Sequence, residues 1–310
     1  MRSPAITSQS AGRSRALSLQ IIHRTEYVYD SAVSSSYGLL CLLPRSTPGQ
    51  AVLRSQLVIE PTPDAYNEFT DFYGNHVANF SVATSHTKLI VTATSEVSIS
   101  GAMALDPDQF LRPSWDDAVQ RLVDGANQAD LEAREFAFAS ELIPLTDLVR
   151  SYAASSFWPG RGLLEIVSDL TGRIHQDIVY KPGVTTLSTL PGDVLSLGEG
   201  VCQDFAHLQI ACLRSFGLAA RYVSGYLETL PPPGQAKLRG ADASHAWLSV
   251  YVPDLGWVDV DPTNNCFIGE RHICTAWGRD YRDVSPVKGI IFTDAKRNTM
   301  TVSVDVSHMP

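Results

Sequence analysis

The spacing of apolar residues changes twice along the chain, and these changes constrain the fold more than any other feature. From residue 17 to about residue 100, apolar and polar residues alternate, as in "LQIIHRTEYVYD" and "KLIVTATSEVSI". That alternation is the period of a β-strand. The spacing becomes helical from about residue 113, and the strand period returns after residue 218. The order predicts an N-terminal β region, then helices, then a second antiparallel sheet, which is an α+β architecture.

Two segments of the middle region carry apolar residues at positions i, i+3, i+4 and i+7. The first runs from Leu145 to Tyr152, with Thr146 as its expected N-cap, and the second runs from Leu163 to Ile178. We expect both segments to form helices whose apolar faces pack into the core.

The composition indicates a globular chain with a buried core. Of the 310 residues, 44% are apolar and 18% are charged, which is typical of one large or two modest domains. The chain carries 24 basic and 33 acidic side chains, for a net charge of −9. This charge disfavours nucleic acid and acidic membrane surfaces as partners. No apolar run reaches the roughly 20 residues that a membrane span needs.

The cysteines favour a reducing compartment. Five occur without a clustered framework: Cys41, Cys202, Cys212, Cys266 and Cys274. An odd number in a long chain indicates free thiols, and we therefore expect a cytoplasmic protein. Cys266, His272 and Cys274 lack the paired spacing of a structural zinc site, so we expect no metal ligands and no other cofactor.

Three segments are expected along the chain. Residues 1–16 contain three arginines and no apolar run, so we expect a flexible tail there rather than a secretory signal. Residues 17–105 are expected to form the N-terminal β-rich domain. Residues 106–310 are expected to form the domain that carries the chemistry.

Cys202 lies where a glycine-containing loop becomes an amphipathic helix, in "LGEGVCQDFAHLQIACLRSFG" at residues 197–217. The first N–H groups of such a helix have no partners within it, and near the sulfur they favour thiolate over thiol. Cys202 is therefore the candidate nucleophile. Cys212 falls ten residues further along, on the apolar face, where packing is the expected role.

A nucleophilic thiolate needs a base and a group that orients the base. His245 opens the strand pattern "HAWLSVYV", and Asp261 ends the next pattern, "GWVDVDP". Two antiparallel strands joined through "PDLG" would bring these residues side by side. Asp259 lies on the same strand face as Asp261 and competes for the role of the acid, and Asp242 competes more weakly.

Four separated motifs resemble the bacterial transglutaminase-like superfamily. They are "HRTEYVY" together with "DFYGNHVANF", then "GVCQDFAHL", "SHAWLSVYVPDLGWVDVDPTNN" and "GRDYRDVSPVKG". The resemblance spans nearly the whole chain. It implies an α+β fold with a papain-like core, in which helices pack on an antiparallel sheet, preceded by an N-terminal β domain.

The same resemblance implies a catalytic triad. Cys202 takes the place of the nucleophile, His245 that of the base, and Asp261, rather than Asp259, that of the acid. The backbone N–H of Cys202 is the oxyanion donor that we expect.

The reaction implied by the resemblance is amide chemistry through a thioester, on a protein or peptide substrate. Water as the acceptor makes the enzyme a cysteine protease or amidase, whereas an amine makes it a protein-glutamine acyltransferase. The sequence leaves both open. The alternative is a catalytically silent peptide-binding module on the same fold, although the usual sign of one, loss of the cysteine or histidine, is missing.

Overall fold

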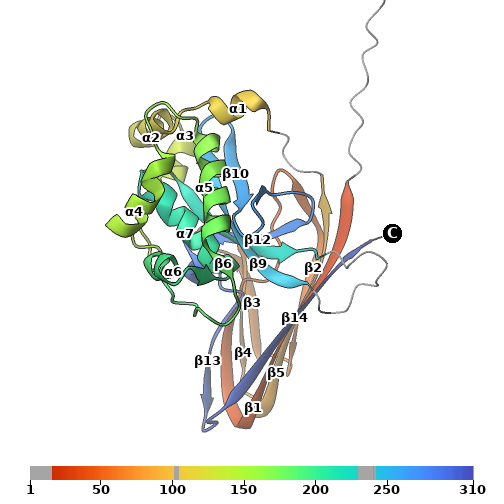
Figure 1. Cartoon of the computed structure of the whole chain (residues 1–310). Coiled ribbons are helices and arrows are strands. Elements are labelled where there is room, and N and C mark those ends of the chain that lie inside the picture. The colour runs from red at the N-terminus through yellow and green to blue at the C-terminus, as the bar shows by residue number, and fades with distance from the viewer. Residues whose placement is uncertain (1–15, 101–104, 230–239, 241, 310) are drawn as a thin grey trace, which may run out of the picture.

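The structure is a computed structural model that describes residues 16–100, 105–229, 240 and 242–309. The expected flexible tail therefore lies outside the described residues, except for Ala16. Within these ranges the chain forms two large antiparallel sheets, and helices cover one face of the second (Figure 1). The predicted α+β class is confirmed.

The first sheet is built around one very long strand, β1 (Leu17–Leu40), in strand order β2-β5-β1-β4-β3. Its other strands are β2 (Gln50–Glu60), β3 (Ala65–Thr70), β4 (His76–Val82), β5 (His86–Ile99), β13 (Val287–Thr293) and β14 (Asn298–His308).

β1 has two halves with different neighbours. Residues 17–28 pair with β5, whereas residues 36–40 pair with β4. The sheet curls around a cluster that contains residues of both neighbouring strands, such as Val91 of β5 and Phe80 of β4, together with Leu40 of β1. The curl buries apolar side chains on its inner face, and burial of each large one stabilises the fold by about 1.5–3 kcal/mol.

The last two strands of the chain join this first sheet. β13 pairs with residues 33–40 of β1, and β14 pairs with residues 19–29. The sequence places these strands with the second sheet, and the structure differs because local periodicity identifies a strand without identifying its partner. The division at residues 105 and 106 stays a prediction.

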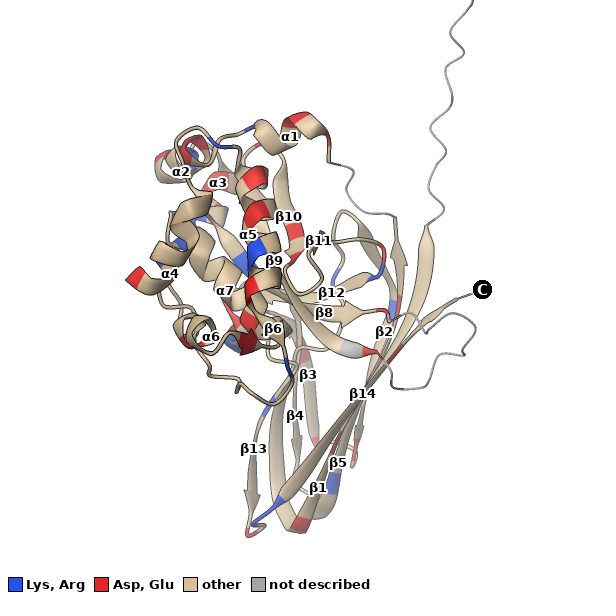
Figure 2. Cartoon of the chain, in the orientation of Figure 1, with Lys and Arg blue, Asp and Glu red and all other residues tan. Residues whose placement is uncertain are grey.

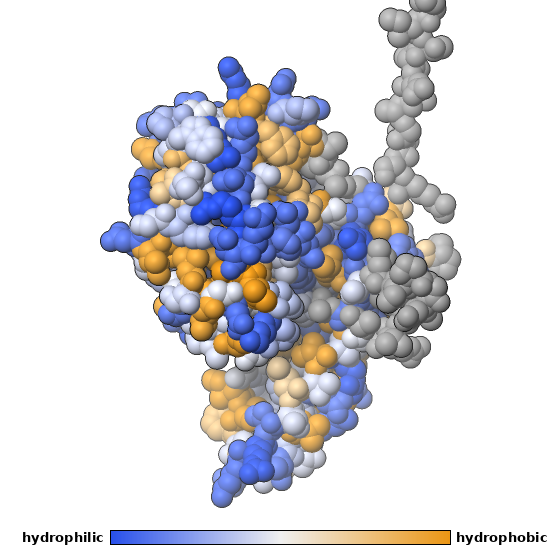
Figure 3. Space-filling model, in the orientation of Figure 1, coloured by the Kyte–Doolittle hydropathy of each residue, from blue (hydrophilic) through white to orange (hydrophobic). Residues whose placement is uncertain are grey.

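The outer face of β13 carries exposed apolar side chains. Ile290 is 67% exposed and Phe292 is 56% exposed. They lie beside Tyr37 and Leu39 of β1, and Figure 3 shows apolar surface over β13. Nothing within the described part of the chain covers these side chains.

The helices occupy the middle of the chain. They are α1 (Pro107–Leu111), α2 (Trp115–Asp124), α3 (Gln128–Arg134), η1 (Glu135–Ala137), α4 (Asp147–Ala153), η2 (Ala154–Ser156), α5 (Leu163–Asp177), α6 (Pro191–Leu197), α7 (Cys202–Arg214) and, near the C-terminus, η3 (Tyr281–Asp283). Acidic positions recur along α1, α2 and α5 in Figure 2, in keeping with the net charge of −9. In the described residues no helix has the length and apolar character to span a membrane.

The two helices expected from the sequence are both present. Thr146 caps α4 by accepting a hydrogen bond from the backbone N–H of Val149. The apolar face of α5 is buried, as predicted. The expectation for α4 is only partly right, because Leu145 and Leu148 are 40% and 54% exposed. α4 is a short helix of seven residues, and its buried residues are Val149 and Ala153.

The second sheet has the strand order β11-β10-β9-β8-β12. Its strands are β8 (Ala220–Leu227), β9 (Ala243–Val252), β10 (Gly256–Asp261), β11 (Cys266–Phe267) and β12 (His272–Gly278). A separate parallel pair, β6 (Val179–Tyr180) with β7 (Glu199–Gly200), lies between α5 and α7 in the sequence.

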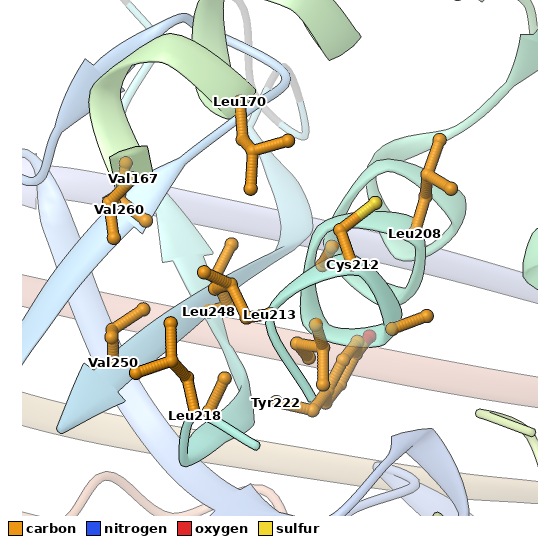
Figure 4. Packing of buried hydrophobic residues seen from close by; sticks show 14 of the residues in the cluster. Val167, Leu170, Leu208, Cys212, Leu213, Leu218, Tyr222, Leu248, Val250 and Val260 are labelled. Atoms are coloured by element: carbon orange, nitrogen blue, oxygen red, sulfur yellow. The ribbon is translucent and has the colours of Figure 1, made fainter. Parts of the chain in front are cut away.

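The two faces of the second sheet have different neighbours. Leu248 and Val250 of β9 belong to the same buried cluster as the apolar residues of α7, whereas Trp247 and Tyr251 belong to other clusters. Figure 4 shows Leu248 beside Leu213 of α7, and Val250 near Leu218. Cys212 is fully buried, so its predicted role in packing is confirmed.

Gly225 allows β12 and Trp247 to approach β8 closely. A Cβ atom at this position would lie 2.1 Å from the carbonyl oxygen of Ile273 and 2.5 Å from the ring of Trp247.

We expect Gly225→Ala to lower the free energy of unfolding by about 2 kcal/mol or more. Gly172→Ala is the matched control, because a Cβ in this α5 position meets only Asn265 Oδ1, at 3.7 Å. The control should raise stability by about 0.5–1 kcal/mol, and denaturant unfolding measures both changes. Equal stability of the two variants would contradict this account.

Candidate active site

Cys202 is the first residue of α7, as the sequence predicts. The carboxylate of Asp204, two residues into the helix, accepts a hydrogen bond from the N–H of Val201 at 2.8 Å and another from the Thr185 hydroxyl at 2.6 Å. A side chain at Gly200 would collide with Asp204, because its Cβ would lie 2.9 Å from that of Asp204. Gly200 and Asp204 thus fix where the helix begins, and with it the position of the Cys202 sulfur.

His245 and Asp261 meet at the ends of neighbouring strands. His245 lies in β9, Asp261 is the last residue of β10, and the two strands are antiparallel neighbours. The Nε2–H of His245 donates a 2.7 Å hydrogen bond to Asp261 Oδ2. Since Nε2 is used by the carboxylate, Nδ1 is the imidazole nitrogen left for the thiol of Cys202. The side chain of Cys202 is close enough to His245 to help raise the pKa of its imidazole.

Asp261 is fully buried, yet every side of its carboxylate is hydrogen-bonded. Oδ2 accepts from His245, from His272 Nε2 at 3.1 Å and from Asn264 Nδ2 at 2.6 Å. Oδ1 accepts the backbone N–H groups of Thr263 at 2.9 Å and Asn264 at 3.2 Å. Five donors around one carboxylate favour its charged form.

These contacts shift the pKa values of His245 and Asp261. Burial on its own lowers the pKa of His245, but the hydrogen bonds and charges of Asp261 and Cys202 outweigh burial and raise it to about 10. Burial raises the pKa of Asp261, and the hydrogen bonds from His245 and His272 outweigh it, holding that pKa well below its usual range. At neutral pH the site therefore holds an imidazolium beside a carboxylate.

His272 is the main site residue that the sequence did not identify. It begins β12, which is separated from β10 by β9 and β8, and its side chain is almost fully buried. Its Nδ1 accepts the backbone N–H of Gly269 at 3.4 Å, so Nε2 carries the hydrogen that Asp261 accepts. In the sequence, His272 stands out only as a possible metal ligand with Cys266 and Cys274. Asn264, in the "DPTNN" turn, also went unnoticed.

Asp259 and Asp242, which competed with Asp261 for the role of the acid, lie in other parts of the structure. Asp259 faces a pocket on the sheet's second face, beside Arg221. Asp242 accepts the backbone N–H groups of Thr229 and of Val306 in β14. Of the three acids, the structure brings Asp261 to His245.

Three potential metal-ligand atoms also meet here. Side-chain atoms of His245, Asp261 and His272 lie within 4.8 Å of one another. Each already takes part in a hydrogen bond that explains its position, so the geometry is accounted for without an ion.

Two family models match the chain. The model for the bacterial transglutaminase-like N-terminal region matches residues 19–98, and the model for the transglutaminase-like superfamily matches residues 156–262. The second match includes Cys202, His245 and Asp261.

Curated relatives are similar over nearly the full length. An uncharacterized protein of Mycobacterium tuberculosis is 42% identical over 299 residues, which cover 93% of this chain and 91% of that protein. An uncharacterized protein of Mycobacterium leprae is 30% identical over 94% of this chain and 99% of its own length. A protein-glutamine gamma-glutamyltransferase of Pseudomonas aeruginosa is 33% identical over only 92 residues, or 29% of this chain and 14% of that protein.

A solved structure shares the fold. It is that of a proposed cysteine protease from Cytophaga hutchinsonii, with a TM-score of 0.75 and 22% identity, covering 96% of this chain and 92% of that one. The two family models together match more than half of the chain, and the chain belongs to the transglutaminase-like superfamily.

Proposed function

We propose that the protein is a thiol enzyme that cleaves an amide bond of a protein or peptide through a thioester on Cys202. The observation that carries the proposal is the position of His245, which donates to the buried carboxylate of Asp261 and interacts electrostatically with the side chain of Cys202. The names of the Pseudomonas transferase and the Cytophaga protein support amide bonds as the substrate class.

In the first step, the thiolate sulfur of Cys202 bonds to the amide carbonyl carbon, and the π electrons of the carbonyl group move to its oxygen. The oxyanion that forms lies at the start of α7, where the backbone N–H of Cys202 is available as a donor. The C–N bond then breaks, and the imidazolium of His245 gives its proton to the departing nitrogen. The products of this step are an amine and a thioester.

In the second step, the neutral imidazole of His245 removes a proton from water as the water oxygen attacks the thioester. The C–S bond breaks, a carboxylic acid leaves, and Cys202 returns as a thiolate beside the imidazolium. Asp261 keeps its charge throughout and orients the ring. A primary amine in place of water would make the same site an acyltransferase.

The proposal also includes the cellular compartment and the type of binding partner. All five cysteines are free, which supports a reducing compartment such as the cytoplasm. The net charge of −9 and the acidic positions along the helices in Figure 2 support a protein or peptide partner over nucleic acid or an acidic membrane.

The direct test combines a peptide library with a labelled primary amine. We expect cleaved or deamidated peptides without incorporation of the amine, and we expect Cys202→Ala to lower the rate at least about 1000-fold. Cys41→Ala is the control, because Cys41 is a buried thiol in the segment that connects β1 to β2, outside the site. Products are identified by mass spectrometry.

Each other outcome overturns part of the proposal. Preferential incorporation of the amine would replace hydrolysis by acyl transfer. Full activity in Cys202→Ala would remove the nucleophile. Peptide binding without any product would indicate the silent binding module.

The protonation of His245 gives a test that needs no substrate. Asp261→Asn removes the carboxylate that opposes the effect of burial, so the pKa of His245 should fall well below the value of about 10 in the native protein. We expect His245 to stay protonated through neutral pH in the native protein and to lose its proton at lower pH in the variant. NMR titration of the ring, assigned with His245→Gln, measures this. Identical titrations would contradict the assigned role of Asp261.

His272 is proposed as a positioning residue for Asp261. His272→Phe removes one donor to a charged oxygen, and we expect kcat to fall about tenfold with KM unchanged. His272→Gln can still donate from its amide and should restore most of the loss. A rise in KM with an unchanged kcat, or no rescue by glutamine, would show that His272 only supports the fold.

A further inference from the structure

A large cavity lies on the second face of the catalytic sheet. Its volume is about 980 Å³. One wall is the sheet itself, through Arg221 of β8 and Trp257 and Asp259 of β10. The opposite walls come from the first sheet's connections, including Tyr73, and from Phe136 of η1. A pocket between two parts of a fold, with mostly apolar walls and few polar groups, is typical of a small-molecule site.

The cavity is separate from the proposed catalytic triad. Cys202, His245 and Asp261 do not line it, whereas His272 does. Residues of β8 and β10 that alternate with Arg221 and Asp259, such as Tyr222 and Val260, pack in the cluster of α7. The pocket therefore opens on the face turned away from α7.

Arg221 is the unusual group in this pocket. It is only 8% exposed, and its guanidinium carbon lies 4.1 Å from the ring centroid of Trp257 and 3.6 Å from that of Trp277. The two rings hold the guanidinium by cation–π contact. Among the described residues, no side-chain or backbone oxygen accepts a hydrogen bond from Arg221, and its Nε is buried without a partner. Buried cations with five donors are normally hydrogen-bonded, so these donors point to an acceptor supplied by a ligand.

The other charged groups of the pocket restrict where an anion can bind. Glu132 and Glu135 lie on the helical wall, and Tyr73 donates its hydroxyl hydrogen to Glu135. Asp259 lies on the sheet wall near Arg221 without forming an ion pair with it in the described structure. Burial raises the pKa of Asp259, although the charge of Arg221 opposes this. If the carboxyl group of Asp259 is protonated, its O–H can donate a hydrogen bond to an anion held by Arg221.

We propose that this cavity binds an organic carboxylate with an apolar body, with its carboxylate on Arg221 and its apolar part against the aromatic walls. A planar guanidinium binds a carboxylate through two parallel hydrogen bonds. The carboxylate can come from a free acid, such as a fatty acid, or from the C-terminus of a peptide with apolar residues. Both sources present the same chemistry to Arg221.

The test compares matched ligands on the full-length protein. Octanoate and octanol share an apolar chain but differ in charge, and N-acetyl-Leu-Phe can be used as its free acid or as its amide. Calorimetry measures the affinity of each ligand. We expect each acid to bind at least about tenfold more tightly than its neutral partner. The tighter of octanoate and the peptide acid identifies the source.

Two variants test whether the ligands bind at Arg221 and in this pocket. Arg221→Met should reduce the affinity for octanoate at least about tenfold and leave that for octanol unchanged, whereas Arg221→Lys should retain part of it. Gly269→Phe should weaken the binding of both ligands, because Gly269 lines the pocket and a Cβ there meets no atom within 4 Å, which leaves room for the added ring to occupy part of the pocket. This second variant leaves Arg221 in place, so it tests the site even where Arg221→Met fails to fold.

The proposal is overturned by either of two results. One is equal affinity of the native protein for octanoate and octanol, and the other is unchanged octanoate binding in Gly269→Phe. Because binding is measured without turnover, neither result depends on the proposed function of Cys202.

Discussion

The buried charge of Asp261 is the constraint around which the site is built. A buried carboxylate needs hydrogen-bond donors in place of water, and each donor that is removed weakens the compensation of its charge. The donors come from β9, from β12 and from the turn after β10. Satisfying Asp261 therefore requires the register of three strands of the second sheet, and that register also brings His245 to Cys202.

The second sheet serves a different purpose on each face. One face packs against α7 and α5, and this fixes the start of α7 and the sulfur at its first residue. The other face holds Arg221 between two tryptophan rings and lines a large pocket. His272 contacts both regions, since it donates to Asp261 and lines the pocket.

The sequence predicts what short segments determine by themselves. Cys202 at a helix start, and His245 and Asp261 on consecutive strands, are visible from spacing and turn signals because β9 and β10 form a hairpin. His272 lies on β12, which pairs with β8 at the far edge of the sheet, and no local pattern shows that pairing. Arg221 is hidden for a similar reason. A basic residue on a strand predicts a solvent-facing position, and only the tertiary structure reveals the tryptophans that enclose it.

The pairing of β13 and β14 with β1 shows why the chain folds as one connected unit. These strands follow the second sheet in sequence but complete the first, so the polypeptide leaves the first sheet and returns to it. A fragment from residue 106 onward would carry both strands without their partner, with exposed backbone groups along each edge. Asp242, just before β9, also accepts the backbone N–H of Val306 in β14. The strand that carries His245 is thus anchored to the first sheet, and that anchor ties the position of the base to the folding of the N-terminal region.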